Sequence, residues 1–167
     1  LKVLLKHRFP VFISTKSSFI IRDIDLLRKI AKETWCTVGF SITTVSNDIA
    51  AFLEPYSSPS NERLASLKEI KKKAPEIQVG TNFMPIIPYL EDDDENLESV
   101  LKESKRAGAD FILFAPGLTL RDTQKEFFIK KLKNSKYHKF VKPLLDLYKN
   151  NNGPKESEGY FHEKNLQ

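Results

Sequence analysis

The sequence predicts an α/β fold in which short parallel strands alternate with helices. Three apolar runs rich in β-branched and aromatic residues, at 12–14, 38–40 and 79–84, give way to small polar residues or prolines, and a helical pattern follows each run. Such strands pair in parallel through right-handed crossovers, so their carboxyl ends share one edge of a sheet or barrel. Because ligands of these folds bind at that edge, the residues after the runs are the first candidates for a site.

The expected elements follow in the order β-α-β-α-β-α-β-α-α. The strands are expected at 10–14, 36–43, 77–84 and 109–115. The helices carry apolar residues at i, i+3 and i+4 spacing and are expected at 22–33, 62–73, 91–108, 123–132 and 139–149, with a short helical turn at 48–52. Residues 1–6 have the pattern of a helix end that leads into the first strand. We therefore expect one domain over 1–149, followed by a polar tail at 150–167 that is loosely ordered except around Tyr160 and Phe161.

Three patterns predict where helices begin or end. Ser58 before Pro59 is typical of an N-cap followed by proline at the first helical position. Thr123, with Glu126 three residues later, forms a capping-box pattern. Gly108 is expected to end the helix at 91–108, because glycine adopts the left-handed backbone conformation without a steric penalty.

Length, composition and cysteine content exclude several classes of protein. The 167 residues can bury a core, but they fall short of the ~250 of a complete eight-stranded β/α barrel. No apolar run approaches the ~20 residues that span a bilayer, so no membrane partner is expected. The net charge of +5 permits anionic ligands or nucleic acid without requiring them. The single cysteine, Cys36, excludes an intramolecular disulfide and is typical of a cytoplasmic protein, and its place after Trp35 at a strand start predicts that it is buried.

Polar residues follow the first two strands. Lys16 can bind a carboxylate or phosphate as a point charge, or can form a Schiff base if it is desolvated. Ser41, Thr43 and Thr44 can form hydrogen bonds to a polar ligand. Each also has a purely structural interpretation, since lysine is common at the start of a surface loop and hydroxyl residues commonly cap strand ends.

Two further features concern the later part of the chain. The stiff apolar exit of the third strand, Pro85-Ile86-Ile87-Pro88, suits the floor of a pocket for adenine or another flat ring, or alternatively a rigid turn. Arg63, near a helix start, can reach an anionic group at the rim of such a pocket, or can be an ordinary solvated residue.

Some familiar ligand motifs are missing from the sequence. The acidic run 91–95 lacks the ligand spacing of a calcium loop. No GxGxxG or GxxxxGK[ST] motif occurs, so neither a dinucleotide fold nor a P-loop is indicated.

Six motifs occur in an order that is informative as a set. They are Thr15-Lys16-Ser17, Arg22-Asp23-x-Asp25-Leu26-Leu27, Phe40-Ser41-Ile42-Thr43-Thr44, Leu53-Glu54-Pro55, Pro59-x-x-Glu62-Arg63-Leu64 and Pro85-Ile86-Ile87-Pro88. Together they resemble the radical S-adenosylmethionine (radical SAM) superfamily, in the DNA repair photolyase-like branch related to spore photoproduct lyase. The segment 118–128, which includes Arg121 and Asp122, also resembles the carboxyl-terminal segment of that branch, and the likeness runs over 9–148.

This resemblance implies part of a radical-SAM-type partial TIM barrel. In that family S-adenosylmethionine binds to a [4Fe–4S] cluster held by a CxxxCxxC loop. This chain has no CxxxCxxC and begins at Leu1 rather than Met, so the resemblance implies the later two-thirds of such an enzyme, inactive and without a cluster when alone. The residues implied to contact S-adenosylmethionine or the substrate are Lys16 and Ser17 at the barrel mouth, Ser41 and Thr43 at the ribose and amino acid moiety, Arg63 at the methionine carboxylate, and Ile86 and Ile87 at the adenine.

Two other functions and one partner remain open from the sequence. One alternative is a Schiff-base lyase or aldolase that uses Lys16, and the other is a non-catalytic nucleic-acid-binding domain that uses the basic helices; a nucleic acid substrate also fits the resemblance. The strand at 10–14 has no expected outer neighbour, and some of the alternating residues Phe12, Phe40, Ile42 and Phe83 are expected to face an open interior. We therefore expect this edge to pair with the missing part of the barrel or with a second copy of the chain.

Overall fold

The computed structural model describes residues 1–120 and 123–150. The chain divides into two compact units. Unit 1 consists of Leu1–Pro85 and Asp93–Ala115, and unit 2 consists of Ile86–Asp92 and Pro116–Gln167. The predicted polar tail, with Tyr160 and Phe161, lies outside the described residues, except that position 150 ends a helix. The pair Arg121 and Asp122 also lies outside them.

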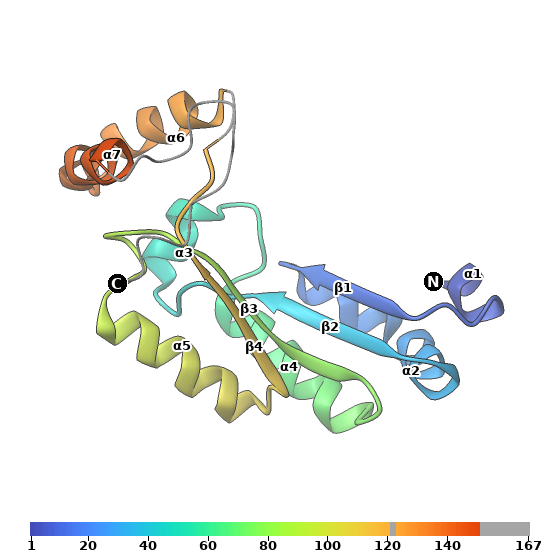
Figure 1. The fold of residues 1–167 in the computed structure, drawn as a ribbon. Helices are drawn as coiled ribbons and strands as arrows, with labels where there is room; N and C mark the ends of the chain where they lie inside the picture. The colour runs from blue at the N-terminus through green and yellow to red at the C-terminus, as the bar shows by residue number, and fades with distance from the viewer. Residues whose placement is uncertain (121–122, 151–167) are drawn as a thin grey trace. The chain divides into compact units, whose positions relative to one another are not determined.

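Four strands form one sheet in the order β1-β2-β3-β4 (Figure 1). They are β1 (Val11–Thr15), β2 (Cys36–Ser41), β3 (Gln78–Ile86) and β4 (Phe111–Pro116). β2 is parallel to both β1 and β3. The N–H of Asp110 donates to the Val79 carbonyl, and the N–H of Gly117 donates to the Ile86 carbonyl. The residue numbers of the two partners increase in the same direction along β3 and β4, which is the pattern of a parallel pair. The predicted parallel α/β fold is therefore confirmed.

In unit 1 one helix precedes the first strand, and the other helices lie in the connections between the strands. They are α1 (Lys2–Lys6), the 3₁₀ helix η1 (Ser18–Asp23), α2 (Ile24–Glu33), α3 (Asn47–Leu53), α4 (Ser60–Lys73) and α5 (Asp94–Ala107). Because the strands follow one another in sequence order, every right-handed crossover advances in the same direction, which places α2, α4 and α5 on the same face of the sheet (Figure 1). A hydrogen bond of 2.8 Å between the hydroxyls of Thr81 and Ser104 joins β3 to α5 on that face.

The side chains of the sheet alternate between two faces. The helix-covered face contains fully or almost fully buried apolar residues, among them Cys36, Val38, Phe40, Ile42, Val79 and Phe83. These pack with buried residues of the helices, namely Leu27, Ile30, Leu67, Ile70 and Val100. The burial of Cys36 is thus confirmed. By the strand register, the residues of β1 to β3 on the opposite face, which we call the open face, are Phe12, Ser14, Thr37, Gly39, Ser41, Gln78, Gly80 and Asn82. Phe12, Phe40, Ile42 and Phe83 were the candidates to face an open barrel interior. Of these four residues only Phe12 lies on the open face, where its side chain is 47% exposed.

Local signals account for both ends of α5. The Asp93 side chain accepts a hydrogen bond of 2.9 Å from the N–H of Asn96, and acidic residues occupy the first turn, where they complement the helix dipole. At the other end Gly108 adopts the left-handed conformation with φ of 91°, as predicted.

The predicted cap at Ser58 is wrong, the capping bond predicted at Thr123 is not formed, and the helices predicted at 22–33 and 91–108 begin later, at Ile24 and Asp94. Pro59, not Ser58, precedes the first residue of α4, and the Ser58 hydroxyl instead accepts a hydrogen bond of 3.0 Å from the N–H of Ser18. Thr123 makes no side-chain capping bond, so its capping-box pattern is not used. The predicted helix at 22–33 begins at Ile24, because the preceding residues form η1. A tertiary contact thus replaces the predicted cap at Ser58, and a tighter local helix replaces the first residues of the helix predicted at 22–33.

Unit 2 is a small helical unit. Its elements are α6 (Gln124–Lys133), the 3₁₀ helix η2 (His138–Phe140) and α7 (Val141–Asn150). The Tyr148 hydroxyl donates to the Leu118 carbonyl at 2.5 Å and accepts from the Leu118 N–H at 2.9 Å, and the rings of Tyr89 and Phe140 stack with centroids 6.3 Å apart. Pro143 lies in the first turn of α7, where its missing N–H breaks no intrahelical bond. No helix within the described ranges is long and apolar enough to cross a membrane.

Candidate functional site

A buried arginine connects the carboxyl end of β2 to the loops around it. Arg63 on α4 is only 1% exposed, and its guanidinium makes three close contacts within the protein. Its Nη1 donates to the Ser41 carbonyl at 2.6 Å, its Nε donates to the Ser58 carbonyl at 2.6 Å, and its Nη2 lies 2.5 Å from Oε2 of Glu54. The planar fork of arginine suits this task, because it presents several donors in fixed directions.

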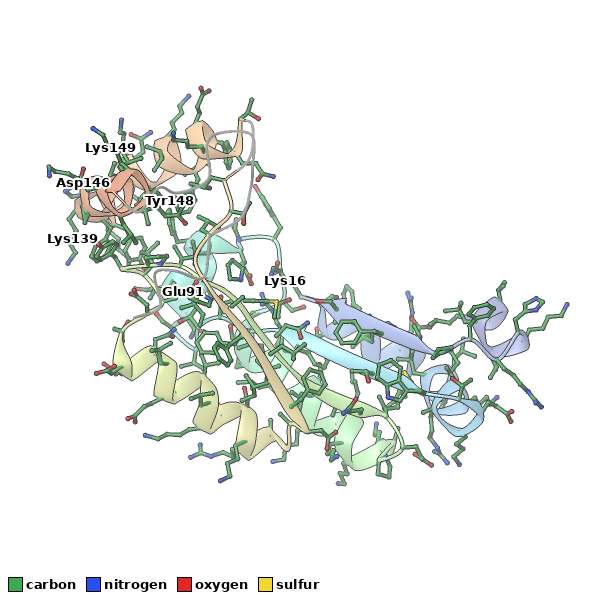
Figure 2. The ribbon with its side chains drawn as sticks, in the orientation of Figure 1. Lys16, Glu91, Lys139, Asp146, Tyr148 and Lys149 are labelled. Atoms are coloured by element: carbon green, nitrogen blue, oxygen red, sulfur yellow. The ribbon has the colours of Figure 1, made fainter. Side chains whose placement is uncertain are left out.

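Glu54 joins this arginine to the lysine at the end of β1. Its other oxygen, Oε1, lies 3.0 Å from Nζ of Lys16. The Lys16 side chain is 40% exposed and the Glu54 side chain 14%, so the ion pairs run from the protein interior to the solvent. Figure 2 shows Lys16 near the carboxyl end of β1. We call Lys16, Glu54, Ser58 and Arg63, with the carbonyl of Ser41, the strand-tip network.

Backbone and hydroxyl contacts hold the strand-tip network in place. The N–H of Ser58 donates to the Lys16 carbonyl at 3.2 Å, so the loop before α4 is attached to the chain after β1. The hydroxyls of Ser18 and Ser58 lie 3.1 Å apart, and Ser18 also donates to Glu62 at 3.3 Å. Residues that are far apart in sequence thus lie together beyond the ends of two neighbouring strands.

The charges of the network decide what it can bind. Arg63 is enclosed and all three of its contacts are to protein groups, so it positions the carboxylate and the loop rather than presenting a free charge. Lys16 is the cation of the network that reaches solvent, and it can attract an anionic group. In this ion pair Lys16 acts as an ammonium, whereas a Schiff-base mechanism uses the neutral amine.

The other predicted residues after β1 and β2 have local structural contacts. The Ser17 hydroxyl accepts from the N–H of Phe19 and caps η1. Ser41 is 8% exposed and Thr43 is 5% exposed, and the Thr43 carbonyl accepts a hydrogen bond of 2.9 Å from the Asn96 side chain. The structure therefore brings Lys16, Ser41 and Arg63 into one network and leaves Ser17 and Thr43 beside it.

The predicted adenine contacts, Ile86 and Ile87, belong to unit 2, whereas the other five predicted residues belong to unit 1. Both isoleucines are buried, at 8% and 6% exposure. The N–H of Ile87 donates to the carboxylate of Glu91 at 3.0 Å, which closes a tight turn after β3.

Sequence reasoning missed Glu54 as the centre of the network. The signal was present in part, since Glu54 belongs to one of the six motifs and directly follows a short helix. Its two basic partners lie 38 residues before it and nine residues after it, so no helical or strand periodicity connects them. Asn82, on the open face, was missed as well, because nothing in the pattern of β3 distinguishes it from an ordinary strand residue.

Neither the cysteine nor a metal cluster adds chemistry to this site. Burial raises the pKa of the Cys36 thiol to about 11, so at neutral pH it is a protonated core residue and not a thiolate nucleophile. Over 1–120 and 123–150, no group of three or more His, Cys, Asp or Glu side chains is arranged to hold a metal ion.

Unit 2 carries a second candidate surface, which is basic and aromatic. Residues 123–150 contain eight lysines and only two acidic residues. Three lysines lie over aromatic rings: Lys131 over Phe127 at 5.6 Å, Lys136 over Tyr137 at 5.4 Å and Lys139 over Phe140 at 4.9 Å from the ring centroid. We call these six residues the lysine–aromatic surface. The Phe127 ring is 64% exposed, so this part of the surface is open to solvent.

Comparisons with known proteins identify relatives whose names assign no function. No family model matches the chain, and no solved structure gives a significant match. An uncharacterized protein of Methanocaldococcus jannaschii is 29% identical over 101 residues, which are 60% of this chain and 36% of that protein. Uncharacterized proteins of Mycobacterium bovis and Mycobacterium tuberculosis are 26% identical over 120 residues, which are 72% of this chain and 34% of theirs. The chain thus spans about a third of the length of these curated relatives.

Proposed function

We propose that this chain is part of a radical SAM enzyme of the branch related to spore photoproduct lyase, and that its strands belong to a partial β/α barrel. The strand-tip network is the observation that carries the proposal. Lys16, Ser41, Glu54, Glu62 and Arg63 come from four of the six motifs that resemble this family, and they lie within one set of contacts at the carboxyl ends of β1 and β2. The consecutive strand order with helices on one face also fits a barrel segment.

The roles of the residues follow from their contacts. S-adenosylmethionine bound to an iron–sulfur cluster supplies a 5′-deoxyadenosyl radical. The exposed ammonium of Lys16 fits the methionine carboxylate, and Arg63 acts as a positioning residue that holds Glu54 and the tip of β2. The cluster itself does not fit this chain, because Cys36 is its only cysteine and is buried. The cluster ligands must therefore come from residues outside these 167.

Binding of S-adenosylhomocysteine to the 167-residue chain tests the proposal. We expect saturable binding by isothermal titration calorimetry, and we expect Lys16→Met to weaken it about tenfold, which corresponds to ~1.4 kcal/mol. Lys72→Met, which removes an exposed lysine on α4, is the matched control and should leave the affinity unchanged. Absence of saturable binding, or equal weakening by both variants, would contradict the proposal.

The residues encoded upstream of Leu1 provide an independent test. If the gene encodes a longer protein of this class, a CxxxCxxC motif should occur roughly a hundred residues before Lys16, a distance scaled from ~30 residues per βαβ unit. Borohydride trapping separates the Schiff-base alternative, since only a carbonyl substrate bound covalently to Lys16 would be trapped. An upstream sequence without the motif would contradict the radical SAM proposal, and a trapped adduct at Lys16 would favour the aldolase class.

The lysine–aromatic surface favours nucleic-acid binding as a second candidate function. The Phe127 ring is exposed and can stack on a base, and the neighbouring lysines can contact phosphates, so the surface suits a single strand. Fluorescence anisotropy with a labelled oligothymidylate should show salt-dependent binding that Phe127→Ala weakens roughly tenfold, since stacking contributes about 1–3 kcal/mol per base. Phe19, 81% exposed on η1, supplies the matched Phe19→Ala control. Equal affinity of the Phe127→Ala variant and the unmodified chain would exclude this function for the surface.

A further inference from the structure

The side chain of Asn82 lies across the full width of a neighbouring strand. Asn82 is on β3, yet its Nδ2 donates to Oγ of Ser14 on β1 at 2.9 Å, although β2 lies between these two strands. Gly39 of β2, which is opposite Ser14 in the register, leaves the necessary space. A Cβ at Gly39 would lie 2.5–2.8 Å from the amide atoms of Asn82. The two residues therefore form a matched pair, in which the amide needs the glycine.

The carbonyl oxygen of this amide has no hydrogen-bond partner in the part of the chain that the structure describes. Asn82 is 4% exposed, and its Oδ1 is buried without a hydrogen bond to any described residue. Burying a polar atom without a partner is unfavourable, because its hydration is lost and nothing replaces it. A leucine would occupy similar space in a parallel sheet without this penalty. The hydrogen bond to Ser14 satisfies the amide nitrogen, so it is the buried oxygen that contacts among the described residues do not account for.

The neighbouring groups define the chemistry that would satisfy Asn82. The Ser14 oxygen already accepts a hydrogen bond from Asn82, so the proton of its hydroxyl is available for donation. Ser14 is exposed, so its hydroxyl can be reached from solvent next to the buried amide. One acceptor and one donor thus lie next to each other. The residues that β1, β2 and β3 place on the open face carry no charge, so a charged ligand would find no counter-ion among them.

We propose that Ser14 and Asn82, above Gly39, form a subsite for a neutral ligand group with adjacent N–H and C=O groups, such as a carboxamide or a lactam. The ligand N–H donates to Oδ1 of Asn82, and the ligand carbonyl accepts from the Ser14 hydroxyl. Ser41 lies opposite Asn82 in the register and is bound by Arg63, so the subsite adjoins the strand-tip network. The subsite goes beyond the radical SAM proposal and holds whether or not that proposal is correct.

Titration of the ¹⁵N-labelled chain with δ-valerolactam tests the subsite. We expect saturable shifts of the Asn82 side-chain amide resonances, and at least tenfold weaker binding of N-methyl-δ-valerolactam, which keeps the carbonyl but lacks the donor. Asn82→Leu should abolish saturable binding while leaving the melting temperature unchanged or higher, because the unpaired oxygen is removed. Gln78→Leu removes another amide from β3, one whose Oε1 already accepts from Thr37, and should retain binding.

Ser14→Ala keeps the test decisive if Asn82→Leu does not fold. It removes only an exposed hydroxyl, and we expect it to weaken lactam binding about tenfold, or ~1.4 kcal/mol. Equal binding of the two lactams, or full binding by either the Asn82→Leu or the Ser14→Ala variant, would overturn the subsite. A lower melting temperature of Asn82→Leu together with lost binding in Gln78→Leu would assign Asn82 a purely structural role.

Discussion

Replacing Arg63 by methionine should destabilise the chain strongly, because Arg63 is the buried centre of the strand-tip network. Methionine has a similar length and no charge, so the change removes three contacts while preserving most of the packing. It leaves Oε2 of Glu54 without its guanidinium, and it leaves the carbonyls of Ser41 and Ser58 without the donors that now lie 2.6 Å away.

The expected cost can be estimated from burial. Removing one partner of a buried ion pair costs about 3–5 kcal/mol, since the remaining charge stays desolvated. Glu54 keeps Lys16 at 3.0 Å and is 14% exposed, so we expect the lower end, about 3 kcal/mol for Arg63→Met. Lys16→Met should cost only about 0–1 kcal/mol, because an ion pair with a partly exposed lysine is screened by solvent.

Urea unfolding of the 167-residue chain, followed by circular dichroism, measures these differences. The free energy of unfolding should fall in the order wild type, Lys16→Met, Arg63→Met. The double variant Glu54→Gln with Arg63→Met should lose less than the sum of the two single variants, because neutral glutamine no longer leaves an isolated charge. The reasoning is refuted if Arg63→Met costs less than about 1 kcal/mol, the range of a surface ion pair, or if Lys16→Met costs as much as Arg63→Met.

Three further predictions concern other parts of the chain. Cys36, whose pKa burial raises to about 11, should react with a disulfide reagent far more slowly in the native chain than in urea; equal rates would show that the thiol is accessible. Burial alone would raise the pKa of Asp110, but the hydrogen bonds from Lys71 and the Val79 N–H, together with the charge of Lys71, outweigh burial and lower this pKa. The ionised carboxylate therefore stabilises the fold at neutral pH, and this stabilisation is lost as the pH falls through the lowered pKa of Asp110. Asp110→Asn should therefore reduce stability by up to about 1 kcal/mol at neutral pH and have no effect in strong acid, measured by urea unfolding at both pH values. Sedimentation should show self-association of the isolated chain through the β1 edge near Phe12, and a monomer that binds no hydrophobic dye at high concentration would contradict this.

The sequence by itself determined the class of the fold and most of its elements. Alternation of β-branched runs with helical spacing is a local property, and it is sufficient to predict a parallel sheet because few other arrangements bury both kinds of apolar face. The burial of Cys36 and the end of α5 at Gly108 followed in the same way, from a residue and its immediate neighbours. The boundaries moved where neighbours in space intervened, as at Ser58, whose hydroxyl serves Ser18 instead of capping α4.

Only the tertiary structure decided how the polar residues are used. Arg63 was expected to face an anionic ligand, but folding places the carboxylate of Glu54 and two carbonyls around it, so its charge is already balanced inside the protein. Asn82 reaches Ser14 only because the register sets Gly39 between them. Such pairings join residues that are distant in sequence, and each depends on positions and distances that no periodicity within one segment encodes.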